Sequence, residues 1–317
     1  MNRFTQRLGG HTRRALQIGI ALSLVLALAF QWQAIETFDW RLSWLPFVGA
    51  VCLFSIGPVA GGTSFWLILR DLTPSARLCA SLGVWGRSFA ARYVPSGALL
   101  VAVRMSERGR LGASSAQIWS ATAYEQLVAA AAGAAVSLAA FLAAGRKPPI
   151  AALAILVGVL VVTVAAQPVA GRWLRRRNSG PDHARSVLLG SHVFATALAL
   201  CACGWLVAGA AAWVFVSALT SGPTPGFLFL LGAYTLAWLV GFVVPFIPSG
   251  LGVREATLIA LLAPVFGAAG ATALAVGLRL ANVGGDLLAI GAMETAQRCA
   301  RRWGRPNSAT TIAVETS

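Results

Sequence analysis

Charged side chains are scarce in this sequence. Of its 317 residues, 11% are charged and 57% are hydrophobic, and the mean hydropathy is positive. A soluble domain carries about 25% charged residues, so this chain has too little polar surface to be one. The composition instead predicts a polytopic membrane protein.

The motifs of soluble enzymes are missing as well. The sequence has no phosphate-binding Walker loop, no HExxH motif, no nucleophile elbow with a triad, and only three histidines. Its five cysteines lack the spacing of metal ligands. We therefore expect no catalytic residue, no metal and no cofactor. Without an ATP site, any transport would run down a gradient or be coupled to ions.

What the sequence does contain is a series of long apolar runs. A helix needs about 20 apolar residues to cross a hydrocarbon core of about 30 Å. The runs predict an all-α membrane bundle of about 8 transmembrane helices. We expect one transmembrane domain at 15–302, with possible halves at 1–145 and 146–317, and cytoplasmic tails at 1–14 and 303–317. The predicted spans are Ala15–Phe30, Trp44–Leu69, Gln117–Leu142, Ile150–Ala166, Phe194–Leu219, Phe227–Phe246, Ala256–Ala268 and Ala271–Ala292.

The net charge of +15 comes almost wholly from arginine, and most arginines lie in short loops beside apolar runs. This is the distribution of the positive-inside rule rather than that of a nucleic-acid-binding protein. Placing the arginine-rich loops on one side leaves Arg41, Arg146 and Lys147 outside. We therefore expect a multi-pass protein of the cytoplasmic membrane, with both termini cytoplasmic.

The stretch 78–103 does not fit a simple crossing. If it crossed once, every later loop would change sides and the arginine-rich C-terminal segment would lie outside. It also contains Arg87 and Arg92, and each arginine would cost at least ~2.5 kcal/mol at the centre of a lipid-facing helix. We expect a re-entrant or broken segment that lines a cavity.

Two near-copies of one phrase interrupt the apolar sequence, RYVPSG at 92–97 and PFIPSG at 245–250. Proline removes a backbone donor and glycine permits sharp turns, so both phrases break a helix. Interrupted segments at corresponding places of two halves indicate a transporter's binding site. Two ordinary turns at the membrane surface are the alternative.

Two acidic residues lie inside predicted spans, Glu125 and Asp286. Arg279, Asn282 and Asp286 share one helix face, but Arg279 and Asp286 are roughly 10 Å apart along it. Each therefore needs a partner elsewhere, for which we expect Arg254 and Glu125. Such residues serve either a functional site or a structural polar zipper between helices.

The chain after Gly250 starts a helix, and the free amides of its first turn, with Arg254 nearby, can bind an anion such as a lipid phosphate. Arg92 and Arg104 would offer an anion the same kind of site at the first phrase. For Arg104 the alternative is an arginine that snorkels to the interface.

These motifs resemble the lysylphosphatidylglycerol synthase transmembrane-region family of flippase-like membrane proteins. The late motif, Pro-x-Gly-x-Gly-x-Arg-Glu, is matched by Pro248, Gly250, Gly252, Arg254 and Glu255, with Arg279 at the arginine of the final helix. The early motif is matched by Pro95, Gly97, Arg104 and Glu125, but Pro-Ser-Gly replaces Pro-Gly, and Gln126 follows Glu125 in place of an arginine.

The resemblance implies that the chain binds or translocates a lipid or lipid-linked glycan through a central polar cavity. Its partner would be a membrane lipid or lipid-linked sugar with an anionic headgroup, and a homo-oligomer or an envelope-synthesis enzyme are further partners to consider. Because no soluble synthase domain follows, we expect no synthase activity. The alternatives are a scaffolding subunit and a membrane-embedded glycosyltransferase or its accessory subunit, which would use Glu36 and Asp39 in the first outer loop.

Overall fold

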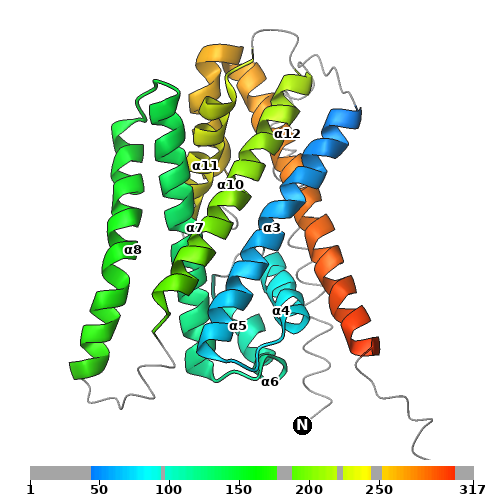
Figure 1. The fold of residues 1–317 in the computed structure, drawn as a ribbon. Helices are drawn as coiled ribbons and strands as arrows, with labels where there is room; N and C mark the ends of the chain where they lie inside the picture. The colour runs from blue at the N-terminus through cyan, green and yellow to red at the C-terminus, as the bar shows by residue number, and fades with distance from the viewer. Residues whose placement is uncertain (1–43, 94–96, 177–187, 220–223, 244–251, 304–317) are drawn as a thin grey trace, which may run out of the picture.

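The computed structural model describes residues 44–93, 97–176, 188–219, 224–243 and 252–303. Within these ranges the regular structure is helical throughout, which confirms the predicted all-α bundle. The elements, labelled in Figure 1, are α3 (Trp44–Leu72), α4 (Leu78–Ala90), the 3₁₀ helix η1 (Ala91–Tyr93), α5 (Gly97–Ser106), α6 (Arg108–Leu111), α7 (Ser115–Ala143), α8 (Ile150–Arg176), α10 (Ser191–Leu219), α11 (Phe227–Val243) and α12 (Val253–Trp303).

Four of the described helices, α3, α7, α10 and α12, are long and apolar enough to cross a membrane, and α8 and α11 contain shorter apolar stretches. Their positions agree with the apolar runs of the sequence. The predicted spans Trp44–Leu69, Gln117–Leu142, Ile150–Ala166 and Phe194–Leu219 fall within α3, α7, α8 and α10 in turn. The predicted span Ala15–Phe30 lies outside the described residues.

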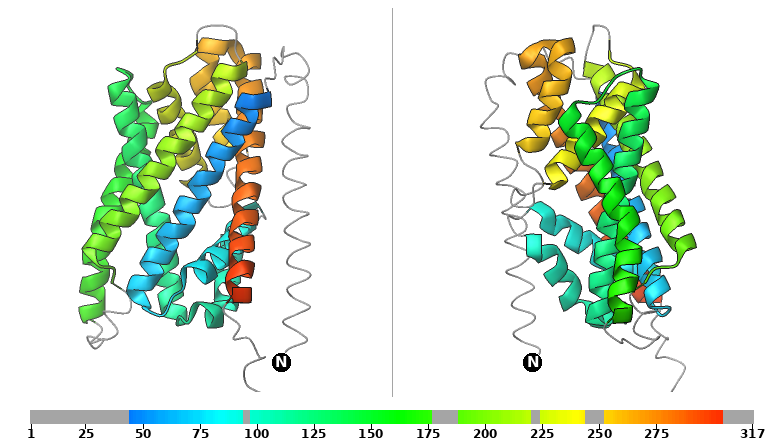
Figure 2. Two further views of the ribbon diagram at one scale, coloured as in Figure 1. Left: turned by 45° about the vertical axis from the view of Figure 1, so that its right-hand side comes forward. Right: turned by 90° about the vertical axis from the view of Figure 1, so that its left-hand side faces the viewer.

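Helices α3 and α10 form the scaffold of the bundle, side by side and in opposite directions (Figures 1 and 2). Small residues allow this close approach. A Cβ atom added at Gly204 would lie 3.2 Å from the Cβ atom of Ala60 and 3.7 Å from the Cα atom of Gly57. The two backbones therefore meet without large side chains between them, as is usual where membrane helices pack.

Helices α4 and α5 form the first broken pair. Helix α4 starts at the end of the bundle where α3 stops, and α5 returns to that same end, where α6 and the start of α7 follow (Figure 1). With 13 and 10 residues, they are about 20 and 15 Å long, too short to cross a core of about 30 Å. The segment at 78–103 is thus re-entrant, as predicted.

Helix α11 and the first arm of α12 form a second broken pair, which enters from the opposite end (Figures 1 and 2). Helix α12 turns at Gly267, whose φ of 69° and ψ of 168° suit glycine. The runs predicted as Ala256–Ala268 and Ala271–Ala292 are therefore two arms of one element. The first arm is only about 20 Å long, so it is not the separate crossing that the sequence suggested.

The same series, a long helix, a broken pair and another long helix, thus occurs twice. In the first series the long helices are α3 and α7, and the broken pair between them is α4 with α5. In the second series the long elements are α10 and the second arm of α12, and the broken pair between them is α11 with the first arm of α12. The two series run in opposite directions through the bundle (Figure 1). Inverted series of this kind, with broken helices that end near mid-depth, are common in transporters.

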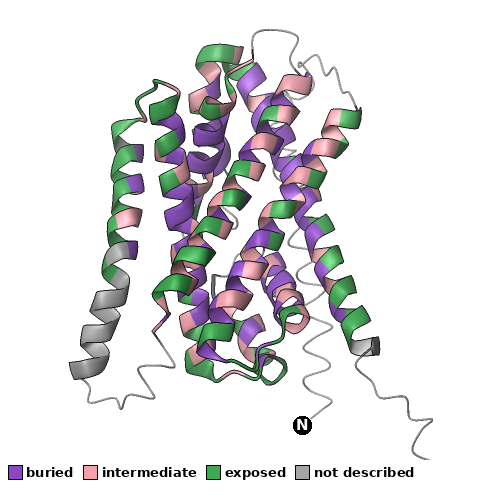
Figure 3. Ribbon diagram, viewed as in Figure 1, coloured by how far each residue is buried: buried purple, intermediate pink, exposed green. Residues whose placement is uncertain are grey.

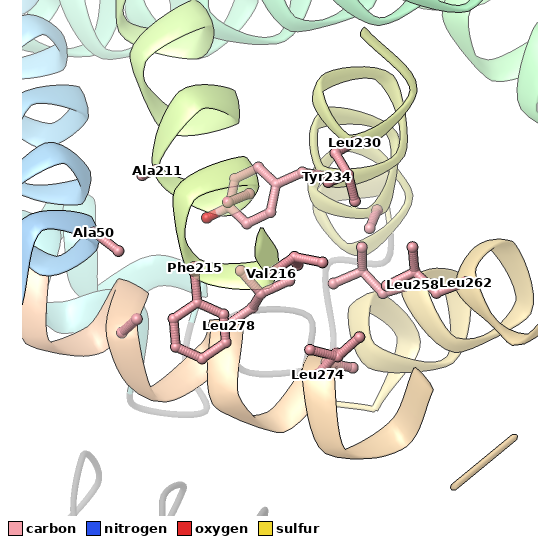
Figure 4. Close-up of a cluster of buried hydrophobic side chains, with 14 of the residues drawn as sticks. Ala50, Ala211, Phe215, Val216, Leu230, Tyr234, Leu258, Leu262, Leu274 and Leu278 are labelled. Atoms are coloured by element: carbon pink, nitrogen blue, oxygen red, sulfur yellow. The ribbon is translucent and has the colours of Figure 1, made fainter. Parts of the chain in front are cut away.

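Apolar side chains hold the second broken pair in place. Leu230 and Tyr234 from α11 pack with Leu258 and Leu262 from the first arm of α12, against Leu274 and Leu278 from its second arm and Phe215 from α10 (Figure 4). Much of the described part of α8 is exposed (Figure 3). Its exposed residues include the apolar Ile150, Val161 and Val162. Such faces suit contact with lipid chains rather than water.

Basic residues gather at one end of the bundle. Arg70 and Arg77 flank the α3–α4 turn, Arg108 and Arg110 lie in α6, and Arg298 lies near the end of α12, all at the end from which the first broken pair enters (Figure 1). The α7–α8 connection at the opposite end carries Arg146 and Lys147. We call the first of these the arginine-rich end.

Candidate functional site

Polar residues of the bundle interior gather where the two broken pairs stop. Helix α4 leads into η1, which carries the first members, and the first turn of α12 carries others. The second arm of α12 and helix α11 complete the set. We call it the central cluster, and its members are Arg92, Tyr93, Tyr234, Arg254, Glu255, Arg279, Asn282 and Asp286.

Arg279, Asn282 and Asp286 share one face of α12, as the spacing predicted. Their exposed fractions are 5%, 9% and 1%. The face therefore points into the protein and away from lipid, which is where a charged residue at membrane depth is expected.

Asp286 is held by the first broken pair. Its carboxylate forms an ion pair with the Arg92 guanidinium and accepts a hydrogen bond from the Tyr93 hydroxyl. Arg92 in turn lies 3.8 Å from the ring centre of Phe89, on α4. Asp286 thus ties the end of α4 to the middle of α12.

The second broken pair makes its own contacts with the second arm of α12. Arg254 Nη1 donates to Asn282 Oδ1 at 3.1 Å, and its guanidinium lies 4.7 Å from the ring centre of Tyr234. Arg279 Nη1 lies 3.6 Å from Glu255 Oε1. These contacts join the two arms of α12 across the turn at Gly267.

The start of α12 is less open to an anion than the sequence suggested. Gly252 has a φ of 84°, and its N–H donates to Glu255 Oε2 at 2.7 Å. A carboxylate of the protein already satisfies this first amide, in the manner of a capping box. Glu255 therefore engages one of the free amides at the start of α12, and Arg254 supplies a charged donor beside the others.

The partners expected for Arg279 and Asp286 were wrong. Arg279 pairs with Glu255 rather than Glu125, and Asp286 pairs with Arg92 rather than Arg254. The sequence shows which residues share a helix face, but partners on other elements depend on how far each broken helix penetrates.

The two tyrosines of the cluster were missed. The chain has only three tyrosines, and Tyr93 and Tyr234 both lie buried in the cluster. A buried tyrosine hydroxyl usually needs a polar partner. The position of Tyr93, directly after Arg92 and before the first Pro-Ser-Gly, was the available signal.

The cluster has more positive than negative charge. Arg92, Arg254 and Arg279 contribute three guanidinium groups, whereas Glu255 and Asp286 contribute two carboxylates, which leaves an excess of one positive charge. Within the described residues, buried Arg254 Nη2 and Arg92 Nε have no hydrogen-bond partner. A buried unpaired donor costs about 1 to 3 kcal/mol, so the arrangement favours an added anionic acceptor.

Arg104 and Glu125 form a separate, closed network. Arg104 Nη1 donates to Glu125 Oε2 at 2.6 Å and Arg104 Nε donates to Ser88 Oγ at 2.9 Å, while Trp85 Nε1 donates to Glu125 Oε1 at 2.7 Å. Arg104 has an exposed fraction of 0%, which rules out the interfacial alternative. The network joins α4 and α5 to α7 and leaves the pair engaged within the protein.

Some predicted residues cannot be placed. Pro95, Pro248 and Gly250 lie outside the described residues, as do Glu36 and Asp39 of the glycosyltransferase alternative, and Gly97 is the first residue of α5. In the described part of the chain, no three histidine, cysteine, aspartate or glutamate residues gather as a metal site would require.

Comparison with known proteins agrees with the motifs. The family model described as the lysylphosphatidylglycerol synthase TM region matches residues 15–289, which include both broken pairs and all of the central cluster. No curated protein matches the chain. The chain therefore belongs to the lysylphosphatidylglycerol synthase transmembrane-region family, and it is an integral membrane protein of lipid-related function.

Proposed function

We propose that this protein binds the anionic headgroup of a membrane lipid in the central cluster and moves the lipid between the two leaflets. The observation that carries the proposal is the buried excess of one positive charge where the two broken pairs stop. An isolated buried charge is costly in a protein interior. A monoanionic phosphate group would balance it.

The broken helices supply a reason for the location. Helical backbone that stops at membrane depth leaves polar groups that lipid cannot satisfy, so it persists only inside protein or beside a watered cavity. Transporters with inverted series of helices bind their substrates at such breaks near mid-depth. The end of η1 at Tyr93 and the start of α12 at Val253 fit this pattern.

Each residue then has a distinct role. Arg254 would bind the headgroup through Nη2, which has no hydrogen-bond partner in the described part of the chain, since guanidinium groups bind phosphate with directed hydrogen bonds. Asp286 would hold Arg92 in place, and Glu255 would hold Arg279. Arg104 and Glu125 would position the first broken pair rather than touch the lipid.

A transfer assay tests the proposal. The purified protein is placed in liposomes that contain an acyl-labelled fluorescent lipid, and a membrane-impermeant reductant bleaches the label in the outer leaflet. We expect the protein to accelerate transfer of phosphatidylglycerol, which is anionic, more than transfer of a cationic lipid with the same chains. If neither lipid moves faster than in protein-free liposomes, the protein does not have this function.

A further inference from the structure

Three arginines from the two broken pairs lie along one face of the second arm of α12. Arg254 donates to Asn282, Arg92 pairs with Asp286, and Arg87 Nη1 donates to Glu294 Oε1 at 2.7 Å and to Gln297 Oε1 at 2.8 Å. The α12 partners follow the spacing of a single helix face. From 282 to 294 the line is about 18 Å long at 1.5 Å per residue, more than half of a core of about 30 Å.

Each of these arginines has a buried donor that finds no hydrogen-bond partner among the described residues. Within the described residues, Arg87 Nη2, Arg92 Nε and Arg254 Nη2 are buried and have no hydrogen-bond partner. All three atoms are N–H donors that a phosphate oxygen could satisfy. The donors therefore repeat from the central cluster toward the arginine-rich end.

The seam between α4 and α12 that contains Arg87 and Arg92 combines glycines and polar side chains with the apolar side chain of Met293. Gly83 and Gly86 face α12 without side chains, and a Cβ atom at Gly83 would lie only 2.3 Å from Gln297 Oε1. Gln297 Nε2 donates to Ala80 O at 3.4 Å. Water can replace the polar contacts in this seam more readily than it can enter the apolar packing that holds the second broken pair.

Exposure increases along the line. The Asp286 side chain is 1% exposed, whereas the Arg87 and Glu294 side chains are each 27% exposed. A headgroup arriving from the arginine-rich end would meet Arg87 first, Arg92 next and Arg254 last.

We propose that the α4–α12 seam is the route by which an anionic phosphodiester headgroup reaches the central cluster, with Arg87, Arg92 and Arg254 as successive binding positions. This route rests on the proposed function. It adds the side of entry, the residues passed and the requirement that α4 and α12 part for the lipid to move.

A reversible cross-link tests the route. A Cβ atom at Gly86 would lie 3.7 Å from Met293 Cβ, within the range of disulfides, so Gly86→Cys with Met293→Cys should form a bond across the seam. All five native cysteines are first replaced. The control joins α3 to α10 through Ala60→Cys and Gly204→Cys, where a Cβ atom at Gly204 would lie 3.2 Å from Ala60 Cβ, about 0.3 Å closer than the usual disulfide range.

We expect oxidation of the seam pair to slow phosphatidylglycerol transfer at least about tenfold, because α4 and α12 can no longer part. A reductant should restore the transfer rate. The control pair should transfer lipid equally well in both states. Equal transfer by the oxidised and reduced seam pair overturns the route while leaving the proposed function standing. If the unmodified protein does not accelerate transfer, the proposed function fails and the route with it.

Thiol labelling gives a second test that needs no cross-link. A single Gly86→Cys protein is labelled with a water-soluble maleimide, alone and with Glu294→Gln or Glu107→Gln added. Glu294 joins Arg87 to α12. Glu107 instead joins Arg87 to the turn after α5, and its Oε1 atom lies 3.2 Å from Arg87 Nε. Both substitutions remove one carboxylate from Arg87, but only the first loosens the seam.

Loss of one charge-assisted hydrogen bond should speed labelling by about 10- to 100-fold in the Glu294→Gln protein and leave labelling of the Glu107→Gln protein unchanged. Vesicles containing phosphatidylglycerol should slow labelling, whereas inorganic phosphate should not. Equal labelling rates for the two variants contradict a seam that opens. Protection by free phosphate alone contradicts a lipid headgroup as the ligand.

Discussion

The Asp286 carboxylate shows how strongly one residue can depend on its partner. It is almost fully buried, forms an ion pair with Arg92 and accepts a hydrogen bond from the Tyr93 hydroxyl. In a low-dielectric interior the pair itself contributes little net stability, but removing one member leaves the other charge buried and alone.

Asp286→Asn alone should therefore cost about 3 to 5 kcal/mol of unfolding free energy, and the double variant Asp286→Asn with Arg92→Gln should cost less than that. The measurement is thermal unfolding of each purified protein in one detergent. Melting temperatures that fall further in the double variant than in Asp286→Asn would show that the two side chains do not form a coupled pair.

At the residue scale, the sequence predicted which polar residues are buried better than it predicted their contacts. Arg279, Asn282 and Asp286 could be placed on one face because they belong to one helix. The pairs Arg92–Asp286 and Arg104–Glu125 could not be predicted. They depend on the depth at which α4 and α5 stop, and no local pattern sets that depth.

At the scale of elements, glycine decides where helices can touch. In α12, Gly285 packs against α3, and a Cβ atom there would lie 2.6 Å from Phe54 Cβ and 2.9 Å from the Ser55 backbone nitrogen. Gly291, less than two turns further on, has nothing within 4 Å of the same position. The two glycines share a helix but differ in what faces them.

Gly285→Ala should destabilise the protein by about 1 to 3 kcal/mol because the backbone of α3 must move. Gly291→Ala should be neutral or stabilising by up to about 1 kcal/mol, since alanine favours helix over glycine. Melting temperatures of the two variants provide the comparison. If Gly285→Ala melts as high as Gly291→Ala, the close contact between α12 and α3 is incorrect.

The long helices were predictable because their apolar runs are continuous. The ends of α3, α7 and α10 agree with those runs to within three residues, whereas α8 continues ten residues beyond its predicted end at Ala166. The first arm of α12 was not recognised as half of a broken pair. Its apolar sequence resembles that of a short span, and only the backbone turn at Gly267 reveals that it returns into the same element.

At the scale of the whole molecule, the arginine distribution and the direction of the broken pairs are linked. The first pair enters from the arginine-rich end and the second from the opposite end (Figure 1). We propose that the arginine-rich end faces the cytoplasm, because loops rich in arginine are retained on that side. The C-terminal end of α12 would then lie on the cytoplasmic side.

Cysteine labelling of intact cells tests this orientation. In a cysteine-free background, a membrane-impermeant maleimide should label Lys147→Cys, in the α7–α8 connection, and should not label Arg108→Cys, in α6. Both positions are exposed, so each serves as the control for the other. Labelling at position 108 and not at 147 would reverse the orientation.

The most direct test of the central claim is the rate of lipid transfer by the Arg254→Ala protein, compared with Arg254→Lys and with Arg70→Ala as an exposed control on α3. Loss of one charge-assisted contact of about 1.5 to 3 kcal/mol predicts a tenfold to hundredfold slower transfer of phosphatidylglycerol by Arg254→Ala. Lysine should restore only part of the rate because its ammonium keeps the charge but lacks the fixed planar donor geometry of a guanidinium, and Arg70→Ala should transfer lipid as the unmodified protein does. If the Arg254→Ala protein melts at the original temperature and transfers lipid at the original rate, the central cluster is not the headgroup site.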